Sequence, residues 1–527
     1  MNASMDATAM NRAQCLERMG EPSREWDIII IGGGATGLGA ALESASKGYR
    51  TLLLEQSDFA KSTSSKSTKL VHGGVRYLAQ GDVGLVREAS IERGLLYRNA
   101  SHLVRNQHFI IPVYSFFDCI KYTIGLKLYD WISGRMSLGS SVFISRKKTL
   151  ATMPGIKPQG LVGGVLYHDG QFDDSRMAIN LAQTIFEKGG CALNYISVTG
   201  LLKSAGKVAG VTAVDTETGR SFSLKAKAVI NATGVFVDDI LKMDDPSAHK
   251  SICVSQGVHI VLDRKFFPSD HALMIPKTTD GRVLFAVPWH DKLVVGTTDT
   301  PVDNASLEPV ALEKEIQFIL QTAGAYLVMR PQRSDVKSVF AGLRPLAAPQ
   351  GEGQKTKEIS RSHKIIVSAS GLFTILGGKW TTYRKMGEDL ISRIEKELLW
   401  EALPTTTPEL PIHGSDNATD WNDPLYYYGS DLKKLKATMN GHKDHWLSEG
   451  LHIHEAQVRW AVDHEMARTL EDVLARRTRA LLLDAKESMR IAKPVAELMA
   501  AALKKDAVWV DQQVHAFNEL ATNYQLN

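Results

Sequence analysis

The chain has 527 residues, of which 44% are hydrophobic and 23% are charged, and its formal net charge is +4. A chain of this length can bury a large core and is expected to form two or three domains. The composition excludes a disordered protein. Because 62 basic residues face 58 acidic ones, the charge gives no reason to expect a nucleic-acid partner.

Neither a membrane-spanning segment nor a metal site is predicted. The longest uncharged apolar run, residues 28–42, is shorter than the roughly 20 residues of a membrane span. The N-terminal stretch lacks an apolar segment, so we expect no signal peptide. Cys15, Cys119, Cys191 and Cys253 are far apart, which predicts reduced thiols in a cytosolic protein.

The first predicted strand runs into a glycine-rich turn and a helix. Residues 28–31 are consecutive isoleucines, as expected for a strand that is buried on both faces of a parallel sheet. Gly32, Gly34 and Gly37 then form the pattern G-x-G-x-x-G, which allows a tight turn and close approach to a pyrophosphate. A second strand ends at Glu55, whose carboxylate is placed to accept hydrogen bonds from a ribose. This unit predicts a bound dinucleotide.

The segment after Glu55, "QSDFAKSTSSKSTKLVHGGVRYL", is polar, contains glycine and has no strand pattern. An NAD dehydrogenase would normally continue with alternating strands and helices, so this segment favours a flavin. We predict that its backbone and hydroxyl groups contact FAD. Its candidate cofactor residues are Ser67, Thr68, Lys69, His72 and Gly73.

Residues 113–133 are predicted to form an amphipathic helix. Its apolar residues recur at steps of three and four, and they are Val113, Phe116, Phe117, Ile120, Ile124, Leu128 and Trp131. Lys121 and Lys127 flank this stripe, and Arg135 follows it. The pattern is typical of a helix that lies in the interface of a bilayer. A helix that packs on the protein's own core would show the same stripe.

Two further strands are followed by glycine turns. The stretch "AKAVINATGVFVDDI" reaches Thr233 and Gly234, and "GLFTILGGKWTTYRKM" reaches Gly377 and Gly378. Such turns allow the backbone to approach a cofactor closely. Three units of this kind, spread over about 350 residues, predict one cofactor held by a discontinuous domain.

The predicted fold class is α/β, with a discontinuous Rossmann-like FAD-binding domain, a mixed-sheet substrate domain and a C-terminal helical domain. The expected ranges are 26–80, 150–250 and 356–397 for the first domain, 81–149 and 251–355 for the second, and 426–527 for the third. The polar, proline-containing residues 398–425 are the expected linker. Thr469 and Asp472 have the spacing of a capping box, which predicts the start of a helix.

Several motifs together match one family. They include "KLVHGGVRYL", "VINATGVFVDD", "AGLRPL" and "LGGKWTTYRKMGED", and they occur in the family's order over residues 14–395. In these motifs the chain resembles FAD-dependent glycerol-3-phosphate dehydrogenases, which are respiratory flavoenzymes related to the mitochondrial enzyme. The resemblance implies oxidation of sn-glycerol 3-phosphate to dihydroxyacetone phosphate by hydride transfer to flavin N5. It also implies that the electrons pass on to a quinone in the membrane.

The resemblance implies roles for individual residues. Arg344 and Lys379 match catalytic positions of the family, and Arg76, Tyr77 and Arg361 match positions that contact the substrate. Arginine forks suit phosphate oxygens, while a lysine acts as a compact point charge.

Two histidines are candidates for moving a proton. His259 matches the family's proposed general base, and an imidazole titrates near neutral pH. The other interpretation of His259 is a strand histidine whose hydrogen bonds are satisfied inside the protein. For His72 we favour a contact with the flavin, or a role in shaping the loop, over proton transfer.

The chain has no D-x-[DN]-x-[DN]-G loop after residue 480. This pattern marks calcium-binding loops, which the animal mitochondrial enzyme carries, so the resemblance favours a bacterial-type protein. We expect it on the cytoplasmic face of a bacterial membrane, as a peripheral protein. A homodimer is left open.

Three other functions stay open at this point. An oxidase would pass the same electrons to oxygen and make hydrogen peroxide, although the apolar stripe argues against it. An amine or amino-acid oxidase would need one cation for a carboxylate and would have little use for four or five. A flavin-bound structural or sensing protein would not be reduced by glycerol 3-phosphate at all.

Overall fold

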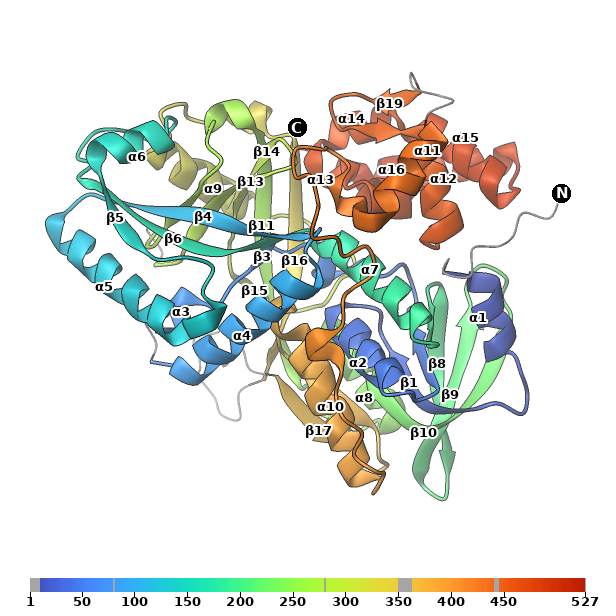
Figure 1. Cartoon of the computed structure of the whole chain (residues 1–527). Helices are drawn as coiled ribbons and strands as arrows, with labels where there is room; N and C mark the ends of the chain where they lie inside the picture. Colours follow the sequence, from blue (N-terminus) through green and yellow to red (C-terminus); the bar gives the residue numbers. More distant parts are fainter. Residues whose placement is uncertain (1–9, 79–80, 279–280, 349–362, 440–444, 527) are drawn as a thin grey trace.

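The computed structural model of the chain contains two large sheets and a C-terminal helical region (Figure 1). The described residues are 10–78, 81–278, 281–348, 363–439 and 445–526, without the side chains of Arg76 and Tyr77.

The first sheet has the parallel core that the isoleucine run predicts. Its strands, in spatial order, are β17 (Lys364–Val367), β18 (Phe373–Leu376), β10 (Ser221–Asn231), β1 (Glu25–Ile31), β2 (Thr51–Leu54) and β7 (Cys191–Leu193), with β8 (Ile196–Ser204) and β9 (Lys207–Asp215) attached through β10. From β18 to β7 the neighbours run parallel, and Ile30 pairs with Ile230 on one side and Leu53 on the other. All three side chains are buried, so the apolar run lies in the interior.

Helices cover the faces of this sheet. They are α1 (Arg12–Met19), α2 (Ala35–Ser46), α7 (Asp174–Glu187), α8 (Val237–Asp244) and α10 (Tyr383–Glu397). A Cβ on Gly39 would lie 2.4 Å from the carbonyl oxygen of Tyr383, and a Cβ on Gly387 would lie 2.4 Å from that of Gly39. Helices α2 and α10 therefore cross in direct backbone contact, which brings the first and third glycine turns together.

The second sheet is mixed. Its strands are β15 (Thr300–Val302), β11 (Ile252–Asp263), β14 (Lys292–Gly296), β13 (Leu284–Trp289), β12 (Ala272–Ile275), β4 (Val104–Val113), β6 (Gly163–Phe172) and β3 (Leu70–Val71), with β16 (Ser338–Ala347) beside β11 and β5 (Val142–Ser145) beside β6. Its helices are α3 (Val75–Leu78), α4 (Val83–Asn99), α5 (Phe116–Ser133), α6 (Arg146–Thr152) and α9 (Glu313–Tyr326). Strands β3 and β6 belong to this sheet although they fall within the segments 26–80 and 150–250 that we assigned to the FAD-binding domain. The short β3 also lies in a stretch for which no strand was predicted.

The C-terminal region packs on one face of the second sheet. Its elements are α11 (Leu432–Met439), β19 (Trp446–Ser448), β20 (Ile453–His454), α12 (Glu455–His464), the π-helical turn Asp472–Arg477, α13 (Ala480–Leu483), α14 (Ala485–Arg490), α15 (Ala492–Leu503) and α16 (Ala507–Thr522). One apolar core joins Leu474 and Leu482 of this region to Trp289 and Phe340 of the sheet. The backbone N–H of Asp472 donates to Thr469 Oγ1 (3.3 Å), and that of Thr469 donates to Asp472 Oδ2 (3.0 Å). These two hydrogen bonds confirm the predicted capping box.

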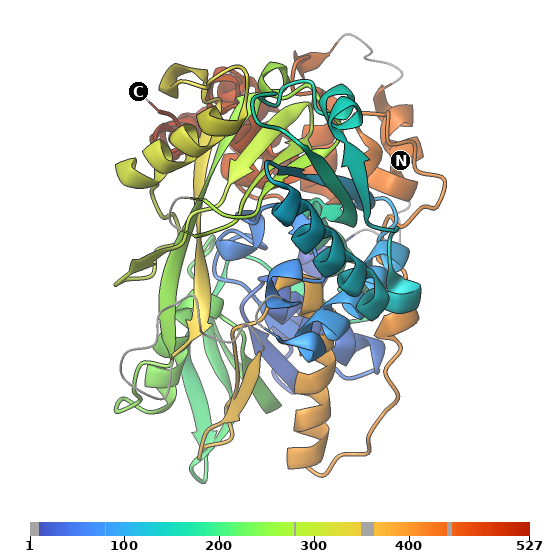
Figure 2. The same cartoon turned by 90° about the vertical axis from the view of Figure 1, so that its left-hand side faces the viewer.

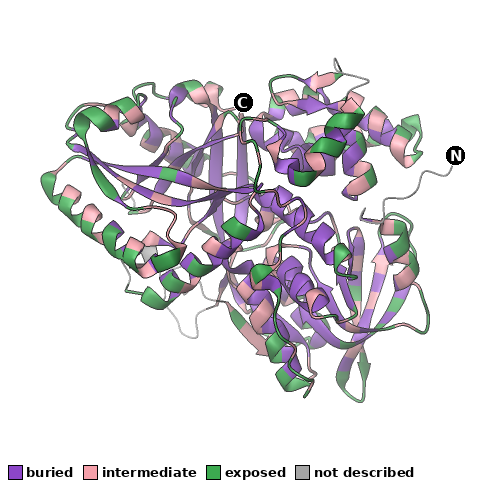
Figure 3. Cartoon of the chain, in the orientation of Figure 1, coloured by how far each residue is buried: buried purple, intermediate pink, exposed green. Residues whose placement is uncertain are grey.

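Helix α5 lies along the outside of the molecule (Figure 2). It begins at Phe116, capped by Ser115, and not at residue 113 as predicted, because Val113 ends β4 and is buried. The other six residues of the apolar stripe are 44–78% exposed, and this surface appears green and pink in Figure 3. The stripe therefore faces away from the core. Within the described ranges, no helix is both long enough and apolar enough to cross a bilayer.

Candidate active site

Three glycine-containing turns lie side by side at one edge of the first sheet. They follow β1, β10 and β18, which are parallel neighbours, so their carboxyl ends meet. A cavity of about 720 Å³ lies between these turns and residues of β11 and β16. Ligands of open α/β sheets bind at this position, outside the carboxyl ends of the strands. The cavity is therefore the candidate active site.

The cavity brings together most of the residues that the sequence singled out. Its lining includes Gly32, Gly34, Glu55, Ser67, Thr68, His72, Thr233, Gly234, His259, Arg344, Gly377, Gly378 and Lys379. Among the predicted site residues that the structure describes, Gly37, Lys69 and Gly73 do not line the cavity. Arg361 and the side chains of Arg76 and Tyr77 lie outside the described part of the chain, so their contacts with a substrate stay predictions.

The first turn has the shape that a pyrophosphate requires. Gly32 has φ of +108°, a conformation that favours glycine, and a Cβ there would lie 2.7 Å from the carbonyl oxygen of Ala232. A Cβ on Gly37 would lie 1.8 Å from the carbonyl oxygen of Gly32. Gly37 thus serves the packing of helix on strand, outside the cavity, while Gly32 and Gly34 line it. The flat backbone beside the N-terminus of α2 fits the diphosphate of FAD.

Glu55 shapes the next part of the lining. Its carboxylate accepts hydrogen bonds from the backbone N–H of Gly33 (2.7 Å) and of Ser57 (2.8 Å). Burial raises the pKa of Glu55, and the two backbone donors oppose this shift. The hydrogen bonds hold the carboxylate between the first turn and the following segment, where it can still accept from a ribose.

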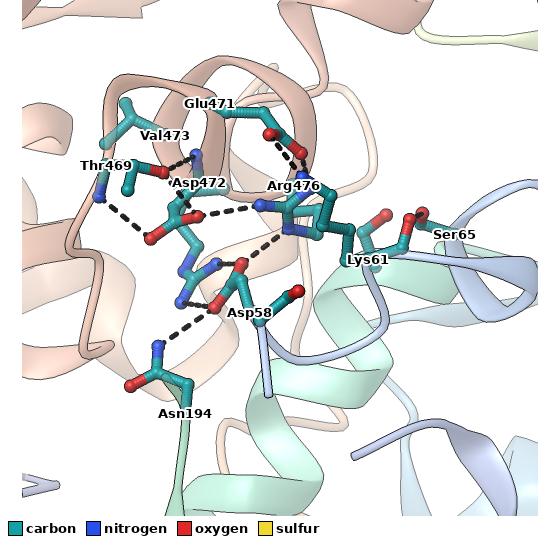
Figure 4. Close-up of polar contacts among 12 residues, drawn as sticks. Asp58, Lys61, Ser65, Asn194, Thr469, Glu471, Asp472, Val473 and Arg476 are labelled. Carbon is teal, nitrogen blue, oxygen red and sulfur yellow. Dashed lines mark hydrogen bonds and ion pairs between the residues drawn. The ribbon is translucent and has the colours of Figure 1, made fainter. Parts of the chain in front are cut away.

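A buried cluster of charges anchors the segment that follows Glu55 (Figure 4). We call it the Asp58 cluster, and it consists of Asp58, Lys61, Glu471, Asp472, Arg476 and Arg477. Asp58 is fully buried and pairs with both Arg476 and Arg477. Burial alone would raise the pKa of Asp58, but the charges of Arg477 and Arg476 outweigh it and hold the pKa below its ordinary value. The cluster ties the cavity wall to the π-helical turn of the C-terminal region.

Lys69 has a different environment from the one predicted. Its Nζ donates to both carboxylate oxygens of Asp174 (2.8 Å each) and to the carbonyl oxygen of Ser65 (2.7 Å). The side chain is fully buried, and it does not line the cavity. Asp174 also accepts from Ser67 Oγ (2.7 Å). Lys69 therefore holds the loop from behind, because a buried lysine needs a counter-charge and Asp174 supplies it on the side away from the cavity.

His259 lies on β11 inside the cavity wall. Its Nε2 is 2.9 Å from Thr68 Oγ1, and its ring stacks on Phe340 with 5.0 Å between the ring centroids. Its Nδ1 has no hydrogen-bond partner among the residues that the structure describes. Burial, followed by the nearby charges of Arg344 and Lys69, lowers the pKa of His259 well below its ordinary value. The imidazole is therefore neutral near pH 7.

Arg344 lies on β16 at the same wall. Its Nη2 donates to Thr297 Oγ1 (3.2 Å) and to the carbonyl oxygen of Thr298 (3.0 Å), and its Nη1 is 3.3 Å from Asp299 Oδ1. These contacts hold the guanidinium in place. Lys379 follows the third glycine turn and lines the cavity as well. Arg344 and Lys379 thus line the same cavity as the neutral His259, and Arg344 lies near enough to lower its pKa.

Glycines that were not among the predicted site residues lie directly against these side chains. Gly257 and Gly342 are paired across β11 and β16. A Cβ on Gly257 would lie 2.2 Å from Arg344 Nη2, and a Cβ on Gly296 would lie 2.3 Å from the ring of His259. Glycine inside a strand often marks close approach of another group, so the glycines in "SQGVHIV" and "FAGLRPL" carried this signal.

The chain matches two family models and is similar to known glycerol-3-phosphate dehydrogenases. A model described as "FAD dependent oxidoreductase" matches residues 27–384, and one described as "C-terminal domain of alpha-glycerophosphate oxidase" matches 375–509. The chain is 36% identical to the mitochondrial glycerol-3-phosphate dehydrogenase of Schizosaccharomyces pombe, with 96% of this chain and 88% of that protein covered. It is 38% identical to the human mitochondrial protein of the same name, with 92% and 71% covered.

Solved structures agree with these matches. The glycerol-3-phosphate dehydrogenase of Bacillus halodurans in complex with FAD superposes with a TM-score of 0.79 at 29% identity, over 98% of each chain. The L-alpha-glycerophosphate oxidase of Mycoplasma pneumoniae shares the fold, with a TM-score of 0.55 at 17% identity over 73% of this chain and 97% of that one. The predicted α/β flavoprotein fold and the FAD cofactor are confirmed. The chain belongs to the family of FAD-dependent glycerol-3-phosphate dehydrogenases.

Proposed function

We propose that this protein oxidises sn-glycerol 3-phosphate to dihydroxyacetone phosphate and delivers the electrons to a quinone in the membrane (EC 1.1.5.3). The observation that carries the proposal is one cavity in which the three glycine turns meet Arg344, Lys379 and His259. When bound there, FAD supplies the two-electron acceptor at flavin N5.

The phosphate of the substrate is assigned to the cations of the cavity. Arg344 offers a planar fork for phosphate oxygens, and Lys379 adds a point charge. The contacts of Arg344 with Thr297 and Thr298 fix its guanidinium before a substrate arrives. Binding then costs less side-chain entropy than it would with a mobile arginine.

The hydroxyl proton of the substrate is assigned to His259. Oxidation of the C2 carbinol would remove one hydride, for which bound FAD would supply the acceptor, and one proton from the hydroxyl, so that a C=O bond forms. A neutral imidazole can take that proton, and the lowered pKa of His259 keeps it neutral at pH 7. The hydrogen bond with Thr68 orients the ring.

The decisive experiment is anaerobic stopped-flow reduction of the purified holoprotein with glycerol 3-phosphate, followed by addition of a soluble quinone analogue. We expect fast bleaching of the visible flavin absorbance and fast recovery with the quinone. A flavin that stays oxidised in the presence of the substrate would contradict the proposed reaction, and it would favour a structural or sensing role.

An oxidase that uses oxygen is the second candidate. The match of residues 375–509 to the C-terminal domain of an alpha-glycerophosphate oxidase is the observation that favours it. Hydrogen peroxide measured in air against quinone reduced under nitrogen separates the two. Stoichiometric peroxide together with slow reoxidation by the quinone would replace our proposal with this one.

We also propose that the protein is peripheral on the cytoplasmic face of a bacterial membrane and docks through α5. Phe117, Ile124 and Trp131 expose 64–78% of their surfaces on one side of this helix. Lys121 and Lys127 lie along the helix and suit anionic headgroups. A quinone dissolved in lipid would then be met at the surface of the bilayer.

Sedimentation with vesicles of phosphatidylcholine and phosphatidylglycerol tests this surface. The double variant Phe117→Ser/Trp131→Ser should lose most of its binding while its flavin spectrum stays unchanged. Val508→Ser, which alters an exposed apolar residue on α16, is the matched control. Equal binding of the double variant and the control would exclude α5 as the docking surface.

A further inference from the structure

The inner face of α5 contacts the loop that contains His72. Tyr129 is 1% exposed, and its hydroxyl accepts a hydrogen bond from the backbone N–H of Gly73 at 2.9 Å. The two residues are 56 positions apart in the sequence. The same helix thus carries the exposed apolar stripe on one side and this buried contact on the other.

Two charged residues complete the arrangement around the Tyr129 hydroxyl. Asp169 accepts from that hydroxyl (3.1 Å) and also from the backbone N–H of Gly73 (3.3 Å), and Arg93 donates both to the hydroxyl (2.8 Å) and to Asp169 (2.6 Å). Arg93 and Asp169 are 1% and 3% exposed. We call these three side chains, with the N–H of Gly73, the Tyr129 network. Burial, and then the charge of Asp169, raises the pKa of Tyr129, so the phenol keeps its proton and remains a donor.

The loop rests directly on this network. A Cβ on Gly73 would lie 2.4 Å from the Tyr129 hydroxyl and 2.5 Å from Ser90 Oγ, so no larger residue fits without displacement. The following helix α3 also packs here, because Val75 and Leu78 contact a small core of Leu85, Val86 and Tyr129. The loop cannot move without breaking these contacts.

Gly73 joins His72 to helix α3. On one side His72 lines the cavity, and its backbone N–H donates to Thr381 Oγ1 (3.3 Å) beside the third glycine turn. On the other side α3 carries Arg76 and Tyr77, the residues for which the sequence predicts contact with the substrate. A shift at Gly73 therefore moves the predicted substrate-binding residues relative to the cavity.

We propose that Tyr129 is a positioning residue for substrate binding, acting through the backbone N–H of Gly73. This inference rests on the proposed oxidation of glycerol 3-phosphate. Tyr129 is assigned no contact with the reacting atoms: it sets the place of the segment 72–78, with Asp169 and Arg93 holding its hydroxyl. The proposal predicts that loss of the hydroxyl weakens the use of substrate while the cofactor site keeps FAD.

The test compares Tyr129→Phe with Ser133→Ala. Tyr129→Phe keeps the ring and removes only the hydroxyl. Ser133 is 5% exposed on the same helix, and its Oγ donates to Ser90 Oγ at 3.0 Å, so Ser133→Ala also removes one buried hydrogen bond between α5 and α4. We expect Tyr129→Phe to raise the KM for glycerol 3-phosphate about tenfold, with kcat and bound FAD within about twofold of the parent, and Ser133→Ala to match the parent.

A double-mutant cycle with Gly73→Ala adds a readout that does not depend on the size of a single effect. Gly73→Ala displaces the loop from the other side of the same contact. If both changes act through the contact between Gly73 and Tyr129, the KM of the double variant should be no higher than that of the single variant with the higher KM. Fully multiplicative effects on KM would show that the two residues act separately, and would overturn the proposal.

The outcomes are distinguishable from failure of the proposed function. A parent protein that glycerol 3-phosphate does not bleach would overturn the function itself. A parent that bleaches, with Tyr129→Phe and Ser133→Ala sharing its KM, would overturn the role of Tyr129. Loss of FAD from Tyr129→Phe, with an unchanged KM in the fraction that keeps FAD, would show a merely structural role and would overturn it too.

Discussion

The two ends of the segment 55–78 are held in different ways. The first end is tied by charges, because Asp58 pairs with Arg476 and Arg477, and further along the segment Lys69 pairs with Asp174; all five side chains are buried. The second end is held at Gly73 by the hydroxyl of Tyr129, on a helix whose other face is exposed. Removing one member of a buried ion pair leaves an uncompensated charge and costs about 3–5 kcal/mol. Loss of a buried hydroxyl contact costs about 1–3 kcal/mol.

This difference in anchoring suits the ligand expected at each end, FAD at the first and the substrate at the second. FAD stays bound through many turnovers, so a rigid anchor on the interior of the C-terminal region suits its side of the loop. The substrate enters and the product leaves in every turnover, and a less costly anchor suits the side that carries Arg76 and Tyr77. The following predictions test the comparison.

The largest effect is expected at Asp58. Asp58→Ala leaves Arg477 buried without its ion-pair partner, while Arg476 keeps Glu471 and Asp472, so the free energy of unfolding should fall by about 3–5 kcal/mol. Urea denaturation of the holoprotein measures it, and flavin released during dialysis should increase. Glu397→Ala, which breaks an exposed pair with Arg393, should change stability by about 0.5 kcal/mol or less. If both variants lost equally little, the Asp58 cluster would not be the stronger anchor.

Arg344 provides the reference for a direct contact with the substrate. Arg344→Ala should weaken the binding of glycerol 3-phosphate about 10- to 100-fold, because a charge-assisted hydrogen bond contributes roughly 1.5–3 kcal/mol. The substrate concentration that gives half-maximal bleaching measures this effect. Arg393→Ala on the exposed face of α10 is the matched control. If Arg344→Ala lost less affinity for the substrate than Tyr129→Phe, the direct contact would matter less than the indirect one, contrary to our expectation.

The pH dependence of stability tests a third ion-pair site, at the C-terminal end of α7. The N-terminal end of the same helix carries Asp174, the partner of Lys69. His413 is paired with Glu187 (2.5 Å) and Asp431 (2.7 Å). Burial opposes the charged form, but hydrogen bonds to Asp431 and Glu187 raise the pKa of His413 to about 9. This value exceeds that of an unfolded histidine, about 6.5. The contribution is therefore complete below pH 6.5 and is lost as the pH rises through 9.

Thermal unfolding at several pH values measures this loss. His413→Gln should remove the part of the decline between pH 6.5 and 9 that belongs to this residue. His445→Gln serves as a control, because that histidine is much more exposed. An unchanged pH profile in His413→Gln would contradict the assigned pKa.

The smallest effect is expected on the outer face of α5. Ile124 is 64% exposed, and Ile124→Ser should change the free energy of unfolding by about 0.5 kcal/mol or less. Leu126 is 1% exposed on the inner face, and Leu126→Ala should cost about 2–5 kcal/mol. Urea denaturation of both variants measures the contrast. Similar losses would show that the outer face is packed in solution.

The parts of the site that could be predicted are those encoded over a few consecutive residues. The isoleucine run, the glycines at 32, 34 and 37, and Glu55 all lie within one strand–turn–helix–strand unit, where backbone geometry dictates residue type. The errors came where distant residues decide. Val113 continues the helical spacing of the stripe, yet it is the last residue of β4 and pairs with Gly163 of β6. Lys69 stands among predicted cofactor residues, yet its side chain pairs with Asp174, 105 positions away, in the interior.

A dinucleotide at the first turn, its identity as a flavin, and cations in the motifs around it could all be predicted from short stretches of the sequence, and the comparisons confirm FAD as the cofactor. These properties follow from local backbone demands and from residue chemistry. How the loop is held depends on contacts that form only in the folded chain, because Asp58 meets Arg476 across 418 positions and Gly73 meets Tyr129 across 56. A buried charge or N–H must find a partner somewhere in the fold. No spacing along the chain says where.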